Sequence, residues 1–450
     1  MGTHNLKAEL RILLALAWPA VLTQLASMCL TATDVLMAGR LSTDTLAAIG
    51  IANSLCIPVQ LFFMGILMAI NPITAQLYGA GNYDKIGSKT RQGLWMSLFL
   101  AVPGILFLNQ STPLLVMLGI PDHLIPLVIG YLKAWSWGLP FLTAFFVIRF
   151  FLEGLGHTKP PLVIIAAAVP LNIAANVVFM YGGLGFPAMG AIGVGYATSL
   201  VWFFCFVVQV AWVGTHRSYR SYRLLKRTRP RKTELLEILY IGLPNGVSIG
   251  MEVSMFALVV LFLGPFGAQA ISGHQIAINV ASIFYMVPLG ISIAISIRVG
   301  QAAGRDSLAD IRLAGRAGML LNLIATATLS LITLVFASQL AGLYTVDSDL
   351  RQSAAGLLLL AALFQVFDGI QISSVGCLRG LKDTRVPLLT NCFAYWFVGI
   401  PVGFYFGRLK GLGAPGFWYG LIAGLIIGAT LHSLRLYYLT NHKLAKNCKA

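Results

Sequence analysis

The chain contains few charged residues, and this scarcity decides its class. Only 10% of its 450 residues are Asp, Glu, Lys or Arg, whereas a soluble globular protein has about 25%. Hydrophobic residues make up 58%, so the composition predicts an integral membrane protein with many spans. The formal net charge is +16. We expect no nucleic-acid partner from this excess, because cytoplasmic loops of membrane proteins collect Lys and Arg.

The chain also lacks the motifs of common enzymes and ATP-driven pumps. No GxxxxGK[ST] sequence is present, which excludes a phosphate-binding loop of that type. HExxH does not occur, so we expect a protein that is not an enzyme and needs no cofactor. None of the six cysteines forms a CxxC pair, and we expect neither a disulfide nor a metal site at them. The first apolar run, 12–39, is longer than the hydrophobic part of a cleavable signal peptide.

Long apolar runs divide the chain into twelve expected membrane spans. A helix needs about 20 apolar residues to cross the hydrocarbon core, and these runs are too long for the strands of a membrane barrel. The expected fold is therefore all-α. The spans in order are 12–38, 46–72, 93–118, 124–150, 161–181, 190–213, 236–263, 271–297, 313–339, 352–377, 386–407 and 416–439.

Lys and Arg predict which side of the membrane each connection faces. With the N-terminus inside, 26 of the 31 Lys and Arg residues fall inside and five fall outside. This bias predicts that both termini are cytoplasmic. The segment 214–235 is the one long hydrophilic connection, and it contains eight of the inside basic residues. The same rule explains its charge, although anionic lipid or nucleic acid would also suit it.

The linker separates two halves of six spans each, and the halves repeat. We expect an N-terminal lobe at 1–213, a linker at 214–235 and a C-terminal lobe at 236–450. A shift of 225 positions places Pro19 on Pro244 and aligns several glycines. An even number of spans gives both halves the same direction through the membrane. Sites in transporters of this type lie between or within the two halves, near the membrane midplane.

Three acidic residues lie deep inside apolar runs: Asp34 in the first span, Glu252 in the seventh and Asp368 in the tenth. A carboxylate at this depth is costly and by default marks an ion or substrate pathway. Each acid could instead pair with a buried base and hold helices together. Lys133 and Arg149 are the only bases inside the runs, and both lie near span ends, where they could reach water. The surplus of acids favours a role in binding cations or protons.

Asn172 and Asn176 lie one helical turn apart in the fifth span, and Thr198 lies in the sixth. Together with the carboxylate of Asp34 they would form an oxygen cluster of the kind that Na⁺ prefers. Two asparagines in a membrane helix more often form hydrogen bonds between helices, so the presence of Asp34 is what favours a binding site.

Aromatic residues, 11% of the chain, would suit flat cationic compounds, although ordinary packing explains any single one.

Three motifs in combination resemble the MATE (multidrug and toxic compound extrusion) transporter family. The sequence DVLMAGR begins at Asp34, HQIAIN begins at His274 after Glu252, and CLRGLKD begins at Cys377 after Asp368. The presence of both C-terminal acids is similar to the NorM-type bacterial branch. The resemblance extends over the whole chain.

This resemblance implies a V-shaped pair of six-helix lobes that exports cationic or amphipathic drugs by alternating access. Export would be coupled to inward movement of Na⁺ or H⁺ across the bacterial inner membrane, and we expect a monomer. The implied site of the N-terminal lobe, for ion and drug, consists of Asp34, Asn172, Asn176 and Thr198. The implied cation site of the C-terminal lobe consists of Glu252 and Asp368, with Phe367, Gln275 and Asn279 as accessory residues. Either set would hold Na⁺.

Two other functions remain to be weighed against drug export. A flippase for lipid-linked oligosaccharides or cell-wall precursors, from the same superfamily, would need a basic cavity for a pyrophosphate head group. An integral membrane acyl- or glycosyltransferase would need carboxylates at the membrane surface. The deep charges of this chain are acidic, which argues against the flippase, and they lie too deep in the membrane for the transferase. The sequence leaves the choice between Na⁺ and H⁺ open.

Overall fold

A computed structural model describes residues 5–224 and 226–443 of the chain. Within these ranges every regular element is a helix, apart from one isolated bridge between Gly183 and Phe186. The predicted all-α class is confirmed. Outside the described residues lie Lys446, Cys448 and Lys449.

The described helices form two compact units, and both boundaries between them fall inside a helix. Unit N comprises Leu22–Gly246, and unit C comprises Met1–Val21 together with Val247–Ala450. The first boundary therefore lies within α1 (Leu6–Leu41) and the second within α11 (Lys232–Leu263).

Both boundaries follow a proline by a few residues, Pro19 in α1 and Pro244 in α11. A proline inside a helix removes one backbone hydrogen bond and weakens the helix locally. Leu22 and Val247, which begin the new unit in each case, are 225 positions apart, the same shift that aligns the prolines. The sequence repeat therefore extends to the points where the units divide. The lobes predicted at 1–213 and 236–450 are defined by the repeat, not by compactness, and stay a prediction.

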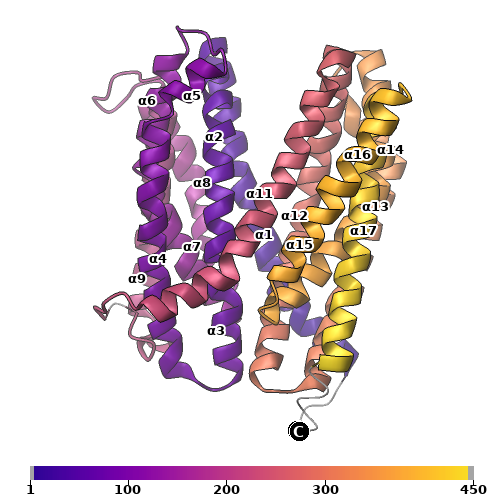
Figure 1. Cartoon of the computed structure of the whole chain (residues 1–450). Coiled ribbons are helices and arrows are strands. Elements are labelled where there is room, and N and C mark those ends of the chain that lie inside the picture. The colour runs from indigo at the N-terminus through magenta and orange to yellow at the C-terminus, as the bar shows by residue number, and fades with distance from the viewer. Residues whose placement is uncertain (1–4, 225, 444–450) are drawn as a thin grey trace. The chain divides into compact units, whose positions relative to one another are not determined.

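Unit N contains the second part of α1, the first part of α11 and the helices between them (Figure 1). These are α2 (Thr43–Leu67), α3 (Ile70–Gly79), α4 (Tyr83–Asn109), α5 (Thr112–Met117), α6 (Ile125–Ser136), α7 (Leu139–Gly154), α8 (Lys159–Met180), α9 (Ala191–Thr215) and α10 (Arg217–Arg220). The helix α7 packs against α3, α4 and α9. It is rich in phenylalanine, and Phe145, Phe150 and Phe151 are fully buried, so this helix forms much of the core of the unit.

Unit C contains the remaining described elements. These are η1 (Gly264–Phe266), α12 (Ala268–Gly304), α13 (Leu308–Gly342), α14 (Ser348–Gly380), α15 (Arg385–Cys392), η2 (Phe393–Gly399), α16 (Ile400–Phe404), η3 (Tyr405–Leu409), α17 (Ala414–Tyr438) and η4 (Leu439–Lys443). The helix α14 packs against α12, α13 and α17, so it lies at the centre of the unit. The elements η2 and η3 are π-helical turns within one span, and such turns are frequent at functional sites.

The number of spans agrees with the prediction if one of them is counted as broken. By length and composition, 11 helices among the described residues could cross a membrane, or up to 12 if the pair α6 and α7 is one span. These two helices are bent by 44°. The bend lies at Trp137 and Gly138, just before Pro140, whose ring nitrogen has no proton to donate to the preceding turn. The predicted fourth span, 124–150, is therefore a bent span.

The prediction placed the third span too far toward the C-terminus. The prediction was 93–118, but α4 ends at Asn109 and the short helix α5 follows, with Pro113 in its first turn. The proline favours the start of a new helix over continuation of the old one. Consequently Lys89 and Arg91, which were expected in a loop, lie on α4.

The expectation that Arg149 reaches water is wrong. Its side chain is 4% exposed, and its Nε lies 2.7 Å from Oε1 of Glu153, one turn further along α7. The guanidinium also donates to Oε1 of Gln24 at 2.6 Å. Residues four apart share a helix face, so Glu153 allows Arg149 to be buried as an ion pair.

The linker between α9 and α11 is docked onto unit N by aromatic side chains. Tyr219 and Tyr222 are buried and meet the ring of Phe151 edge-on, with centroids 6.4 Å and 5.4 Å away. The hydroxyl of Tyr219 also lies 2.9 Å from Nδ1 of His157. These contacts fix the linker to the end of α7.

We expect docking of the linker to weaken at alkaline pH. Burial raises the pKa of Tyr222 to about 12, so the folded protein favours the neutral phenol. The stabilising contribution is complete below pH 10, the ordinary pKa, and is lost as the pH rises from 10 to about 12. The Tm of the wild type should therefore fall more over this range than that of Tyr222→Phe. The exposed Tyr196 supplies the control, because Tyr196→Phe should behave like the wild type. Equal falls in all three proteins would contradict this assignment.

Candidate functional site

Asp34 is the centre of a buried polar cluster in unit N. Its side chain lies on α1 and is 6% exposed. Asn172 and Asn176, one turn apart on α8, donate through Nδ2 to the same carboxylate oxygen, Oδ1, at 3.0 Å and 2.7 Å. Thr198 on α9 lies with its hydroxyl 3.3 Å from the other oxygen, Oδ2. The structure thus brings together all four residues predicted for this lobe.

The cluster leaves two oxygens poorly satisfied. The hydroxyl of Thr198 has one proton, and it lies closer to the Val194 carbonyl, at 2.9 Å, than to Oδ2 of Asp34. Among the described residues, Oδ1 of Asn176 is buried without a hydrogen-bond partner. A buried oxygen without a donor is costly. One carboxylate oxygen and one amide oxygen are therefore available to a cation.

The prediction missed Tyr131 and Asn53 in this part of unit N. Tyr131 on α6 is buried and interacts electrostatically with Asp34. Its hydroxyl donates to Oδ1 of Asn53 on α2 at 3.2 Å. Neither residue is charged, so neither stands out in an apolar run. A search for polar residues alone would have found Asn53, but only the fold places Tyr131 beside the acid.

The two acids of unit C come from different helices and are near enough to interact. Glu252 lies on α11 and is half-buried, whereas Asp368 lies on α14 and is 6% exposed. Their charges interact with each other, and both interact with Tyr285 on α12 and Tyr395 on η2. The structure therefore joins the two residues predicted for this lobe into one cluster, to which two tyrosines contribute.

The surroundings of Asp368 differ from the accessory set that was predicted. Gln371, one turn after Asp368, donates to the hydroxyl of Tyr395, so an aromatic hydroxyl is supplied by another helix. Phe367 packs among the apolar side chains of the unit. Gln275 is exposed, and among the described contacts Asn279 accepts a hydrogen bond from the Tyr344 hydroxyl at 2.7 Å.

His274, in the HQIAIN motif, has a packing role. It is buried, and the indole of Trp418 donates to its Nδ1 at 3.2 Å. The accepted bond fixes the proton of a neutral imidazole on Nε2. This side chain therefore joins α12 to α17.

A family model described as MatE matches residues 19–178 and 244–405. The chain belongs to the MATE family. The two matched segments begin at Pro19 and Pro244, the positions that the repeat aligns. The family inferred from the sequence motifs is therefore confirmed.

Curated relatives identify the branch of the MATE family. The chain is 36% identical over 437 residues to the "Probable multidrug resistance protein NorM" of Pasteurella multocida, covering 96% of this chain and 94% of the relative. It is 35% identical over 441 residues to the "Multidrug resistance protein NorM" of Photobacterium profundum, covering 97% of each. These matches confirm the NorM-type branch.

The fold of this MATE protein is also found among solved structures. The crystal structure of the eukaryotic MATE transporter AtDTX14 superimposes with a TM-score of 0.90 and covers 98% of each chain, at 19% identity. The likeness confirms the fold, and the family is one of multi-pass membrane transporters rather than enzymes.

Proposed function

We propose that this MATE protein exports cationic or amphipathic drugs in exchange for inward movement of Na⁺ or H⁺. The observation that carries the proposal is the carboxylate of Asp34, buried and bound only by neutral donors among the described side chains. A buried carboxylate without a base attracts a cation or a proton. The names of the NorM relatives support drugs as the substrates.

Competition at Asp34 would couple the two movements. Oδ1 is occupied by two amide donors, which hold the carboxylate in place. Oδ2 and the unpartnered Oδ1 of Asn176 are then available to a single cation. If a coupling ion and a drug cation cannot occupy this place together, the binding of one favours release of the other.

The acids of unit C would supply the second coupling site. Glu252 and Asp368 repel each other when both are ionised, and the repulsion is strong in surroundings of low dielectric constant. A Na⁺ ion or a proton bound between them would relieve this repulsion. The hydroxyls of Tyr285 and Tyr395 could complete the oxygen ligands of Na⁺.

Arg379 provides the observation that bears on the flippase alternative. It is buried in the last turn of α14, interacts electrostatically with Tyr285, and has an Nε without a hydrogen-bond partner among the described residues. A pyrophosphate head group would need several such cations. Tyr285 interacts with two acids, Glu252 and Asp368, and with the single base Arg379, so these charged groups carry a net negative charge when both acids are ionised, which favours cationic substrates.

The remaining parts of the proposal concern placement. We place the protein in the bacterial inner membrane with both termini in the cytoplasm, because the Lys and Arg distribution favours this orientation. The monomer is proposed because each candidate cluster is built within one chain.

Ethidium efflux from proteoliposomes tests the proposed exchange. A Na⁺ gradient and a pH gradient are imposed separately on the wild type, Asp368→Asn and Asp349→Asn. One gradient should accelerate efflux by the wild type, and Asp368→Asn should lose that acceleration. Asp349 is an exposed acid on the same helix, so its variant should match the wild type. If neither gradient accelerates efflux, drug exchange is wrong and lipid-linked substrates should be tested.

A further inference from the structure

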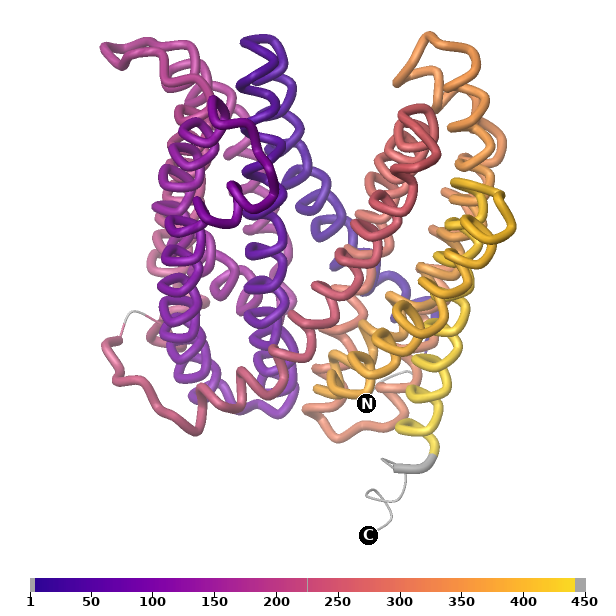
Figure 2. The backbone as a smooth tube through the Cα atoms, turned by 45° about the horizontal axis from the view of Figure 1, so that its top comes forward, coloured from indigo at the N-terminus to yellow at the C-terminus, as the bar shows by residue number. Residues whose placement is uncertain are grey.

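The linker of unit N is bound along its length, not merely tethered at its ends. We name residues 216–231 the basic strap; Figure 2 shows its described parts, 216–224 and 226–231, lying across one end of unit N. Arg91 on α4 donates to the carbonyls of Tyr222 and Arg223 at 3.3 Å and 2.7 Å. The indole of Trp95, one turn further on, donates to the carbonyl of Thr228 at 2.8 Å. Side chains of α4 thus hold the backbone of the strap.

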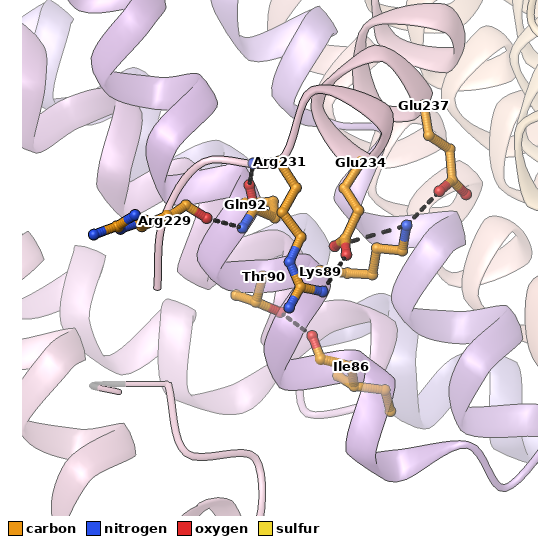
Figure 3. A network of polar contacts seen from close by, with 8 residues as sticks. All are labelled: Ile86, Lys89, Thr90, Gln92, Arg229, Arg231, Glu234 and Glu237. Atoms are coloured by element: carbon orange, nitrogen blue, oxygen red, sulfur yellow. Dashed lines mark hydrogen bonds and ion pairs between the residues drawn. The ribbon is translucent and has the colours of Figure 1, made fainter. Parts of the chain in front are cut away.

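A polar network fixes the end of the basic strap (Figure 3). Gln92 on α4 donates to the Arg229 carbonyl at 3.0 Å and accepts from the Arg231 amide at 2.8 Å. Arg231 also pairs with Glu234 at 3.1 Å, and Lys89 lies 2.5 Å from Oε2 of Glu237. Glu234 therefore pairs with Arg231, the last residue of the strap, and Glu237 pairs with Lys89 of α4.

Close packing at Gly87 shows how firmly the strap is seated. A Cβ atom at this position of α4 would lie 1.7 Å from the carbonyl oxygen of Tyr222. No side chain fits in that space, so the strap backbone rests directly on the helix. Buried Tyr219 and Leu224 anchor it on either side.

The cations of the strap are exposed. No acidic residue occurs within 216–231. Figure 3 shows the guanidinium of Arg229 directed away from the network that binds its carbonyl. The exposed cations of the strap are Arg217, Arg220, Arg223, Lys226, Arg227, Arg229 and Arg231, and Arg231 is the one that pairs with Glu234. The strap therefore presents a fixed array of positive charge without counter-charges of its own.

We propose that the basic strap binds the head groups of anionic membrane lipids. The strap connects two membrane spans directly, since α9 ends at Thr215 and α11 begins at Lys232. Its cations therefore lie near the membrane surface, where anionic head groups are the abundant partner. The preference of cytoplasmic loops for Lys and Arg explains the charge of the strap. A loop that is not docked would meet the same preference, so the charge alone does not explain the docking. Because the backbone is docked on α4, the cations are held together on one surface, where lipid head groups can bind them.

Lipid titration with the full-length protein in uncharged detergent tests this proposal. Short-chain phosphatidylglycerol and phosphatidylcholine are added separately, and bound lipid is counted by native mass spectrometry. The wild type should prefer phosphatidylglycerol. The triple variant R220Q/R223Q/R227Q should bind it at least about tenfold more weakly, because each cation near an anionic surface contributes about fivefold. The variant R220K/R223K/R227K should retain binding, since it keeps the charge.

A matched control removes three exposed cations elsewhere. The variant K7Q/R11Q/R316Q lowers the net charge equally and leaves the strap intact, so it should bind phosphatidylglycerol like the wild type. Equal losses in both glutamine variants would overturn the proposal, because they would show an effect of net charge alone. Competition by inorganic phosphate or by an oligonucleotide at least as strong as that by the lipid would also overturn it. Drug efflux is not measured, so the result is independent of the proposed exchange.

Discussion

Asp34→Asn should abolish gradient-driven efflux while leaving the protein folded. The substitution removes the charge to which Asn172, Asn176 and Thr198 bind. The amide oxygen of the new side chain can still accept from both asparagines, so the polar contacts at Oδ1 are kept while the charge and the second acceptor oxygen are lost. We expect transport to fall by at least about tenfold, as the loss of a charged hydrogen-bonded group costs about 1.5–3 kcal/mol.

Asp44→Asn is the matched control for this experiment. Asp44 is exposed in the first turn of α2, so its variant removes the same charge from unit N without touching the cluster. Efflux should be measured at equal protein content, with Tm recorded for each variant. If Asp34→Asn transports like Asp44→Asn, the carboxylate has no part in coupling. A variant at Asn176 that keeps the charge, Asn176→Ala, should weaken transport less than Asp34→Asn does.

The deep acids and their oxygen partners could be predicted from the sequence because each is an exception in an apolar run. Asp34, Asn172, Asn176 and Thr198 all stand out in this way, and helical spacing already places the two asparagines on one face. The repeat was visible for a similar reason, since prolines and glycines impose backbone geometry that side-chain substitution does not hide. Charges in apolar runs and backbone constraints can therefore be recognised from the sequence alone.

The missed residues share the opposite property. Tyr131, Tyr285 and Tyr395 are aromatic residues among many, and only tertiary packing brings them near the acids. Sequence spacing cannot give this, because each lies on a different helix from the acid it meets. The burial of Arg149 was missed for the same reason, because it depends on contacts with Glu153 and with Gln24 from α1.

The two units satisfy their acids by different means, despite the repeat. In unit N one carboxylate is surrounded by neutral donors. In unit C two carboxylates interact with each other and with Tyr285 and Tyr395, and Arg379 interacts with Tyr285. The shared backbone therefore supports two chemically distinct clusters. The first suits one cation held by amide and carboxylate oxygens, and the second suits a cation or proton shared by two acids.

Arg149→Leu should destabilise the protein more than any surface substitution. It would leave Glu153 buried and unpaired, and breaking one partner of a buried pair costs about 3–5 kcal/mol. Oε2 of Glu153 is already buried without a partner among the described residues, so no second donor compensates. The double variant R149L/E153L removes both charges and should be more stable than Arg149→Leu alone. Unfolding in detergent, followed by Tm and by denaturant titration, measures both.

A surface pair sets the scale for this comparison. Arg305 and Asp310 in unit C lie 3.5 Å apart and are both partly exposed, so Arg305→Leu should cost no more than about 1 kcal/mol. The contrast follows from burial, since water screens the surface pair and cannot reach Glu153. Similar losses for Arg149→Leu and Arg305→Leu would mean that water reaches the pair in α7. A double variant less stable than Arg149→Leu would show that Glu153 is stabilised by groups other than Arg149.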